Sequence, residues 1–300
     1  MVGPTPKRRA IQHAVSAGIG SVRQGCRALR LQASSFYKTR KEAPQKRLMK
    51  EAISQMSWKH PRYGYRRVTV MLRREGWSVG TDMVQRCRRA QGLQVKERQR
   101  KMRRLGLSTA ERQRATHPRQ VWSWDFIQDR TENGSAFKML TIIDEYSREC
   151  FKIWPSWSIR ACDVIKQLEE AMEQYGEPEH LRSDNGPEFI AYAVQDWLKA
   201  KGIKTLYIKP GSPWENAYIE SFHDKLRDEL LNRELFVNLL EARVLTEAHR
   251  CEYNQTRPHS SLDYKTPSAF AADFSSPMGE DGSKEDINTD QVRLYFGGVR

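Results

Sequence analysis

Long apolar runs are missing from the sequence. No stretch approaches the roughly 18 consecutive apolar residues that a membrane-spanning helix requires, and the first residues, MVGPTPKRRA, lack the apolar centre of a signal peptide. We therefore predict a cytosolic protein. The chain has 300 residues, of which 38% are hydrophobic. It is long enough for one sizeable domain and a smaller one, and its composition argues against wholesale disorder.

Closely spaced cysteines are missing as well. The five cysteines lie far apart, at Cys26, Cys87, Cys150, Cys162 and Cys251. No CxxC pair and no Cys/His cluster has the spacing of zinc ligands. We therefore predict neither a disulfide framework nor a structural zinc site.

Acidic residues are scarce in the first 120 positions, which hold 30 Lys and Arg against 6 Asp and Glu, a net charge of +24. The other 180 residues hold 21 against 31, a net charge of −10, and the two values sum to the formal +14 of the chain. A basic segment joined to a mildly acidic one indicates a polyanionic partner, DNA or RNA. An anionic membrane surface is the weaker alternative, since no strongly amphipathic, lipid-facing helix stands out.

Two short helices around a glycine-containing turn, EGWSVG, are predicted between positions 46 and 95. Thr81 and Asp82 offer an N-cap and a favourable first-turn charge for the second helix. Val84 and Cys87 share one face of it, which leaves its arginines pointing largely elsewhere and favours a helix-turn-helix that contacts DNA. An ordinary helical hairpin with a solvated basic face is the alternative. The arginines concerned are Arg86, Arg88 and Arg89.

From Gln120 onward, segments rich in β-branched and aromatic residues alternate with turn signals. VWSWDFIQ, FKMLTIID and CFKIWPSW predict three strands in meander order. Helices and short strands then alternate: ACDVIKQLEEAMEQYG predicts an amphipathic helix, HLRSD a strand, EFIAYAVQDWLKAKG a helix and IKTLYI a strand. Further helices are predicted from Pro213 to Leu231 and from Leu239 to Asn254. Together these elements predict a mixed α/β sheet.

Three acidic residues are candidates for a metal site. Asp125 lies in the first strand, Asp184 follows the short HLRS strand, and Glu220 lies within a predicted helix. Between them lie 184 − 125 − 1 = 58 and 220 − 184 − 1 = 35 residues. Clustered carboxylates are tolerated mainly where cations lie between them, and hard oxygen ligands suit two Mg²⁺ or Mn²⁺ ions that act on the attacking and leaving oxygens. Taken singly, Asp184 could belong to an ordinary turn and Glu220 to a helix surface.

The succession WSWDFI, DEYSR, SDNGPEF, SPWENAYIESFHDKLRDEL and YNQTRPHSSLDYKTP closely resembles the catalytic domain of insertion-sequence transposases, in particular the OrfB product of the IS-three family. That family belongs to the DDE transposase and retroviral integrase superfamily. The likeness covers roughly 120–270, and the 35-residue gap before Glu220 equals the superfamily's spacing. Residues 63–93 also resemble the family's upstream helix-turn-helix. The resemblance implies a ribonuclease H-like core and a catalytic triad of Asp125, Asp184 and Glu220.

Two residues near Glu220 are expected to contact DNA. Asn216 precedes it by four residues and Arg227 follows it by seven, so both share roughly its helical face. The family carries a basic residue at the second position, which implies that Arg227 contacts the terminal DNA. An ion pair with Asp224 is the alternative.

Other polar residues of the same motifs have structural interpretations. Asn185 and Glu188 are expected to shape the loop after Asp184, although Glu188 could instead complement a helix dipole. We expect Asp144 to pair with Arg148, and His259 to cap or pack the C-terminal segment rather than contact phosphate.

We predict a DNA transposase that uses two Mg²⁺ or Mn²⁺ ions to cleave the ends of an insertion sequence and transfer the freed strands into target DNA. Its partners would be double-stranded DNA, further copies of itself and, by the resemblance, the product of an upstream frame, in the nucleoid of the bacterial cytosol. A DNA-binding repressor without catalysis and a structure-specific nuclease on the same fold are the alternatives. The predicted parts are a small helical segment (1–45), a helix-turn-helix region (46–95), a basic linker (96–118), an integrase-type catalytic core (119–275) and an acidic tail (276–300).

Overall fold

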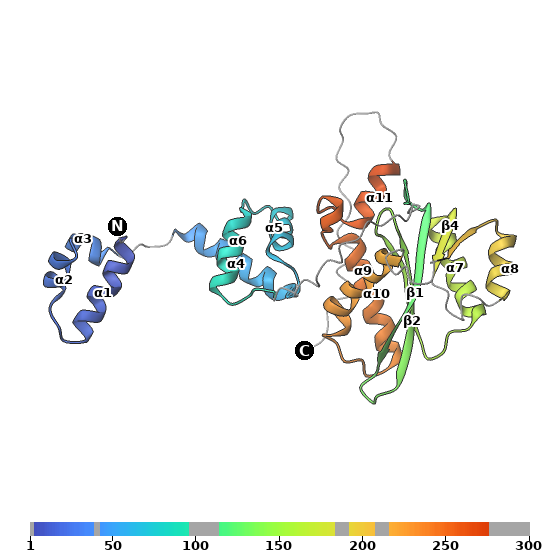
Figure 1. Ribbon diagram of the computed structural model, residues 1–300, viewed down its shortest axis with the longest axis horizontal. Helices are drawn as coiled ribbons and strands as arrows, with labels where there is room; N and C mark the ends of the chain where they lie inside the picture. The colour runs from blue at the N-terminus through green and yellow to red at the C-terminus, as the bar shows by residue number, and fades with distance from the viewer. Residues whose placement is uncertain (1–2, 39–42, 96–113, 184–191, 208–215, 276–300) are drawn as a thin grey trace, which may run out of the picture. The chain divides into compact units, whose positions relative to one another are not determined.

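The computed structural model describes residues 3–38, 43–95, 114–183, 192–207 and 216–275, which Figure 1 draws as helices, strands and connections. It divides into two compact units. One is formed by residues 1–61 and 72–94, and the other by residues 62–71 and 95–300. Most of the basic linker and the acidic tail therefore lie outside the described residues.

The first unit is helical, as predicted. It contains α1 (Pro4–Ser16), α2 (Val22–Ala28), α3 (Ala33–Tyr37), α4 (Pro44–Lys59) and α6 (Thr81–Ala90), while α5 (Tyr65–Arg74) begins in the second unit and ends in the first. Helices α4 and α6 pack together, and Ile53 and Val84 are fully buried in this unit. The N-cap of α6 is Gly80 rather than the expected Thr81, which is the first helical residue. Asp82 does lie in the first turn, where its charge favours the helix dipole.

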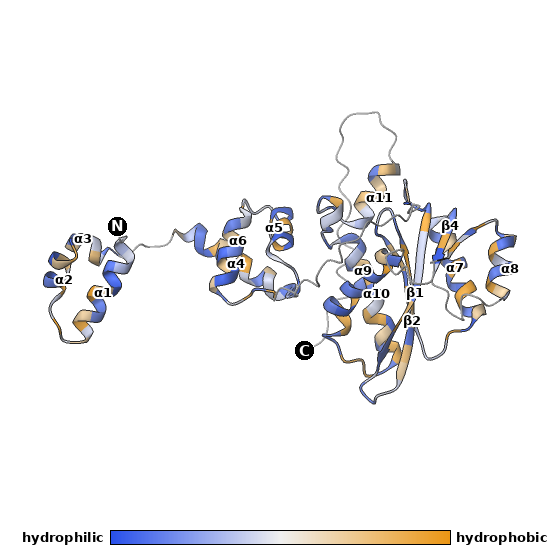
Figure 2. Cartoon of the chain, viewed as in Figure 1, coloured by the Kyte–Doolittle hydropathy of each residue, from blue (hydrophilic) through white to orange (hydrophobic). Residues whose placement is uncertain are grey.

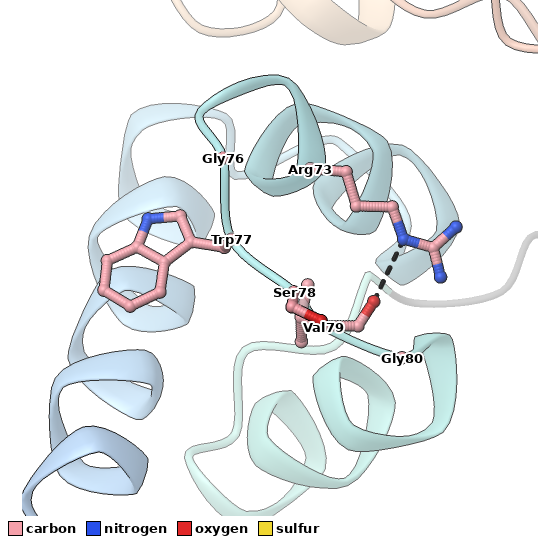
Figure 3. Close-up of a pocket in the computed structure, with 6 residues that line it drawn as sticks. All are labelled: Arg73, Gly76, Trp77, Ser78, Val79 and Gly80. Atoms are coloured by element: carbon pink, nitrogen blue, oxygen red, sulfur yellow. Dashed lines mark hydrogen bonds between the residues drawn. The ribbon is translucent and has the colours of Figure 1, made fainter.

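A tight turn joins α5 to α6. Gly76 has a φ of +88°, a left-handed conformation that a residue with a Cβ adopts only with strain. Figure 3 shows the turn, where the Arg73 Nε donates a hydrogen bond of 3.0 Å to the Val79 carbonyl oxygen. The shallow hollow that the turn encloses is lined by Arg73, Gly76, Trp77, Ser78, Val79 and Gly80.

The second unit is built on a five-stranded mixed sheet. Its strands are β1 (Val121–Arg130), β2 (Ala136–Asp144), β3 (Cys150–Ser156), β4 (His180–Ser183) and β5 (Lys204–Tyr207), in the order β3-β2-β1-β4-β5. The first three form the predicted antiparallel meander, and β4 and β5 add in parallel to β1. The predicted fold class, a ribonuclease H-like α/β core preceded by an all-α region, is confirmed.

Helices cover both faces of the sheet (Figure 1). Helices α7 (Ala161–Tyr175) and α8 (Tyr192–Ala200) enclose one apolar cluster, which includes Trp122 and Trp124. Helices α9 (Ala217–Leu226) and α10 (Leu239–Gln255) enclose a second cluster, which includes Ile127. Since side chains alternate along a strand, β1 turns its tryptophans to one face and Ser123, Asp125 and Ile127 to the other. Figure 2 shows the apolar residues gathered along the strands and the inner sides of these helices.

The C-terminal helices differ from prediction in two places. Where we expected one helix to Leu231, α9 ends at Leu226 and a π-helical turn, η2 (Arg227–Leu231), follows. A short 3-10 turn, η3 (Ser260–Leu262), and helix α11 (Pro267–Ser275) were not predicted, because the segment is short and weakly patterned. Within the part of the chain that the structure describes, no helix is long and apolar enough to cross a membrane.

A buried ion pair connects η2 to the chain beyond α10. The Arg257 guanidinium donates two hydrogen bonds of 2.6 Å to the Glu229 carboxylate, and their side chains are 1% and 7% exposed. Arg67 lies 3.4 Å from the same carboxylate. Next to this pair, burial first and then the Arg257 charge lower the pKa of His259 to about 3, so its imidazole is neutral at neutral pH. The His259 ring lies 6.3 Å from the Tyr253 ring and its amide donates to the Lys265 carbonyl oxygen, so His259 packs within the C-terminal segment, as expected.

Substituting Glu229→Gln should destabilise the protein by about 3 kcal/mol, because it leaves the Arg257 charge buried without its anionic partner. Chemical denaturation measures the change, with Glu234→Gln, an exposed neighbour, as the matched control. A Glu229→Gln variant as stable as that control would contradict the role of the pair.

Candidate active site

Strand β1 places Asp125 at the edge of the core. Its side chain is 22% exposed, and its Oδ1 accepts a hydrogen bond of 2.7 Å from the Phe126 amide. The flanking Trp124 and Ile127 are buried on opposite faces of the sheet. Packing on both faces therefore fixes the strand, and the carboxylate is held at a defined place.

Helix α9 brings a second set of polar groups to Asp125. The helix packs against β1 through the buried face that carries Ile219, Phe222 and Leu226. The Nδ1 of His223 lies 3.7 Å from the Asp125 Oδ2. Glu220 lies three residues earlier, on the same side of the helix, and is exposed. The structure thus brings the α9 face that carries Glu220 to the β1 carboxylate.

Thr141 sets the orientation of His223. Its hydroxyl is fully buried and donates a hydrogen bond of 2.9 Å to the Asp125 carbonyl oxygen. The same Oγ1 lies 2.7 Å from the His223 Nε2. The Thr141 hydroxyl thus occupies Nε2, and the other ring nitrogen, Nδ1, faces the Asp125 carboxylate.

The His223 imidazole is neutral at neutral pH. Burial, and then the positive charge of Arg227, lower the pKa of His223 to about 4. The contact with Asp125 is therefore not a salt bridge. The imidazole therefore adds no positive charge next to the Asp125 carboxylate, from which its Nδ1 lies 3.7 Å away.

Asp184, the third predicted carboxylate, lies outside the described residues, as do Asn185 and Glu188. The strand before it is described: β4 pairs in parallel with β1 and places Arg182 opposite Ser123. In sequence, Asp184 follows Arg182 by two residues and Asp125 follows Ser123 by two residues.

A buried polar cluster supports the junction of β1 and β4. The Arg182 Nε donates a hydrogen bond of 2.7 Å to the Glu145 carboxylate, which also accepts from the Ser123 hydroxyl. Burial raises the pKa of Glu145, and the nearby Arg182 charge opposes that rise. These contacts fix the relative positions of the two strands next to the candidate site.

The expected pairing of Asp144 with Arg148 is wrong. The Asp144 carboxylate accepts hydrogen bonds from the Ser147 amide and hydroxyl and from the Arg119 amide. Arg148 has a φ of +65°, and its guanidinium lies 3.8 Å from the centre of the Tyr218 ring instead. The tight turn after β2 satisfies Asp144 locally and directs Arg148 toward α9.

The predicted DNA-contacting residues fall into two groups. Arg86, Arg89 and Arg227 are exposed, and Arg227 donates a hydrogen bond of 3.4 Å to the Gln128 carbonyl oxygen. Arg88 is only 3% exposed, and its Nε donates to the Leu93 carbonyl oxygen at 3.0 Å. The C-terminal end of α6 thus uses Arg88 as a structural residue, and the prediction that it contacts DNA is wrong.

Asn216 is also placed differently from the prediction. It is the N-cap residue of α9, its side chain is 6% exposed, and its Oδ1 has no hydrogen-bond partner among the residues that the structure describes. The structure therefore does not present Asn216 as an exposed DNA contact.

Sequence reasoning missed His223 and Thr141. His223 carried a usable signal, since it follows Glu220 by three residues on a helix. Thr141 carried none, because its role depends on the antiparallel register that pairs it with Asp125. Among the residues that the structure describes, no three His, Cys, Asp or Glu side chains cluster closely enough to hold a metal ion. These residues include only two of the three predicted carboxylates, Asp125 and Glu220, because Asp184 lies outside them.

Sequence comparisons match two parts of the chain to known domain families. Residues 44–101 match an HTH-like domain, and residues 115–213 and 201–267 match two integrase core domain models. The chain is 36% identical, over 84% of its length and 91% of the relative's, to the insertion element IS407 31.7 kDa protein of Burkholderia multivorans. It is 26% identical to the transposase InsF for insertion sequence IS3A of Escherichia coli, over 83% of this chain and 93% of the relative.

A solved structure of the simian T-cell lymphotropic virus intasome also aligns with the chain. The identity is 16%, 80% of each chain is covered, and the TM-score is 0.49.

The sheet order, the covering helices and the domain matches define a protein with an HTH-like domain and an integrase core. The chain belongs to the insertion-sequence transposases of the IS-three family, within the DDE transposase and retroviral integrase superfamily.

Substituting Thr141→Val should reduce metal-dependent DNA cleavage, because it removes the hydrogen bond that orients His223. The loss of two buried hydrogen bonds should also cost about 1–3 kcal/mol of stability. Cleavage per mole of folded protein checks the first effect. Thr246→Val is the control, since Thr246 is equally buried and its hydroxyl donates to a carbonyl of its own helix. Equal cleavage by the two variants would contradict the role of Thr141.

Proposed function

We propose that the protein is the DNA transposase of an insertion sequence, acting on DNA in the bacterial cytosol. It cleaves at the ends of the element and joins the freed 3′ ends to target DNA, and it uses Asp125, Asp184 and Glu220 as its catalytic carboxylates. The observation that carries the proposal is the packing of α9 on β1, which brings the helix face of Glu220 to the Asp125 carboxylate.

The parallel pairing of β1 and β4 supports the inclusion of Asp184. Ser123 and Arg182 are partners across the two strands, and Asp125 and Asp184 each follow their partner by two residues. Residues at equal distances beyond a parallel pair are expected side by side on the same face of the two strands. Ligands and substrates bind at the carboxyl ends of parallel strands in many open α/β sheets.

The donor set fits two divalent cations of the Mg²⁺ or Mn²⁺ type. Three carboxylates offer hard oxygen ligands, and the neutral His223 adds no positive charge that would compete with a cation beside Asp125. When bound, such ions activate the attacking oxygen and stabilise the leaving oxygen of a phosphodiester.

The protein's own groups have distinct roles in this proposal. Thr141 and His223 hold Asp125 in place, and α9 presents Glu220 toward solvent, where a DNA backbone can approach. Arg227 is exposed seven residues beyond Glu220, so its guanidinium contacts a phosphate of the bound end. Reaction occurs by in-line displacement at phosphorus, without a covalent protein intermediate.

Recognition of the element's terminal repeats is assigned to the helix-turn-helix of α5 and α6. Arg86 and Arg89 are exposed on α6, where they reach phosphates or base edges of the duplex. The active form is an oligomer of this chain on DNA, with the upstream-frame product as a further partner.

Asp125→Asn and Glu220→Gln should each abolish cleavage and joining of a labelled duplex that carries the element's end, and both should leave DNA binding intact. The control is Asp129→Asn. Asp129 lies on the same strand, and its carboxylate accepts a hydrogen bond from the next amide at 2.8 Å, as Asp125 does. Mg²⁺ or Mn²⁺ should be required throughout. Normal joining by the Glu220→Gln variant would refute the catalytic role of the three carboxylates.

Removing Arg86 and Arg89 together by substitution with Ala should weaken binding to the element's end at least tenfold, because two phosphate or base contacts are lost. Fluorescence anisotropy measures the affinity. Arg88→Ala should instead lower thermal stability, since it breaks the buried contact with Leu93. If the Arg88→Ala variant stayed stable and bound DNA more weakly than the double variant, the assignment of Arg86 and Arg89 to DNA contact and of Arg88 to a structural role would be wrong.

A further inference from the structure

The first three helices form a small folded body whose role is not covered by the matched domains, which begin at residue 44. We call residues 3–38, with α1, α2 and α3, the N-terminal triad of helices. Helix α1 packs on α2, and α2 packs on α3. Its buried centre contains Ile11 and Cys26.

Specific contacts hold this body together. Ser21 and Gln24 form a capping box that starts α2. A Cβ on Gly25 would lie 3.0 Å from Ile11 Cγ2, so a larger residue there would displace the Ile11 side chain between α1 and α2. The Arg8 Nε donates a hydrogen bond of 2.6 Å to the Ser35 carbonyl oxygen, which joins α1 to α3.

Helices α2 and α3 are joined by a tight turn. The Leu31 amide donates to the Cys26 carbonyl oxygen at 2.9 Å, and Arg30 has a φ of +47°. This pattern ends α2 with a left-handed residue and redirects the chain into α3. Two short helices around such a turn, packed on a third, have the arrangement of a helix-turn-helix.

The charge of the body is of one sign. Residues 3–38 contain seven Lys or Arg and no Asp or Glu. Arg23 and Arg27 are both exposed and lie four residues apart on one face of α2, and Arg30 is exposed in the turn. A surface with no internal anion to neutralise it has high affinity for phosphates.

The exposed face of α3 carries groups that suit the reading of base edges. Ser34 and Tyr37 are exposed and lie three residues apart on one side of α3, and Lys38, also exposed, is the residue that follows the helix. Tyr37 is 67% exposed although it is large and aromatic. These hydroxyl and ammonium groups can bond to bases and to the backbone in a groove.

We infer that the N-terminal triad of helices is a second helix-turn-helix, which binds duplex DNA of the element's end separately from α5 and α6. Arg23, Arg27 and Arg30 contact phosphates, and α3 enters the groove. The choice of DNA rests on the proposed function, but the binding itself requires neither the carboxylates nor a metal ion. The exposed apolar residues Val15 and Ile19 would instead suit the binding of a protein partner to this surface. The uniform positive charge of the surface favours DNA over a protein partner.

The test uses the full chain carrying Asp125→Asn, in EDTA, so that binding is measured without cleavage. One variant adds Arg23→Ala, Arg27→Ala and Arg30→Ala. A matched variant adds Lys166→Ala, Lys199→Ala and Lys201→Ala, which remove three exposed charges from α7, α8 and the turn after α8. Binding to a duplex carrying the element's end is measured against salt concentration, and hydroxyl-radical footprinting maps the protected positions.

The arginine variant should bind at least tenfold more weakly, and its salt slope should fall by about 2–3, since each lost phosphate contact contributes about 0.9. It should lose one block of protection and keep the block that depends on Arg86 and Arg89. Circular dichroism should match the parent protein, because all three positions are exposed. As a second variant, Ser34→Ala with Tyr37→Ala should lose the same block with little change in slope.

Three results would overturn the inference. An unchanged footprint and slope would do so, as would equal weakening in the lysine control. A change in self-association without a change in the footprint would assign the surface to a protein partner instead. None of these experiments measures cleavage. A negative binding result would therefore not contradict the proposed transposition, and a protein that does not cleave DNA would not contradict this inference.

Discussion

The packing of α9 on β1 is the constraint on which the rest of the site depends. It is an apolar contact, made by Ile219, Phe222 and Leu226 against the sheet, and it has no catalytic chemistry of its own. Its consequence is that His223 comes within 3.7 Å of Asp125, with Glu220 one turn away. The hydrophobic effect thus supplies the free energy that holds the side of α9 with His223 and Glu220 against the strand that carries Asp125.

The two faces of the sheet differ in composition: one is apolar, and the other also carries polar groups. Trp122 and Trp124 face α7 and α8 in a cluster made of apolar side chains. The opposite face combines apolar packing with Ser123, Asp125, Thr141 and the Glu145–Arg182 pair. Because the apolar layer between β1 and helices α7 and α8 is rigid, a few hydrogen bonds are enough to hold the polar residues on the opposite face of β1 in place. This is the arrangement expected of a site that must not shift when a charged duplex binds.

Much of this could be predicted from the sequence, because the signals are local. The meander of three strands, α7, α10 and the helical first unit follow from periodicity and turn residues, and the fold class follows from the resemblance.

What could not be predicted depends on neighbours distant in sequence. Arg86, Arg88 and Arg89 are alike in sequence, and only the packing of α6 makes Arg88 a buried donor to Leu93. Thr141 and His223 meet through strand register, and Asn216 is buried by contacts that no pattern reveals. Motif and spacing proposed Asp125, Asp184 and Glu220, and the catalytic roles of all three stay predictions.

The pairing of β1 with β4 has a consequence for folding. Between these neighbouring strands lie residues 131–179, which contain β2, β3 and α7. Parallel neighbours separated by so much chain cannot form early, since the entropy of closing the intervening segment must first be offset by the folding of that segment. Helix α9 is added later still along the chain. During synthesis, a nascent chain that ends before Leu226 has no complete α9, so His223 and Glu220 cannot be packed against β1. The contact between Asp125 and His223 therefore forms only after most of the second unit has been synthesised.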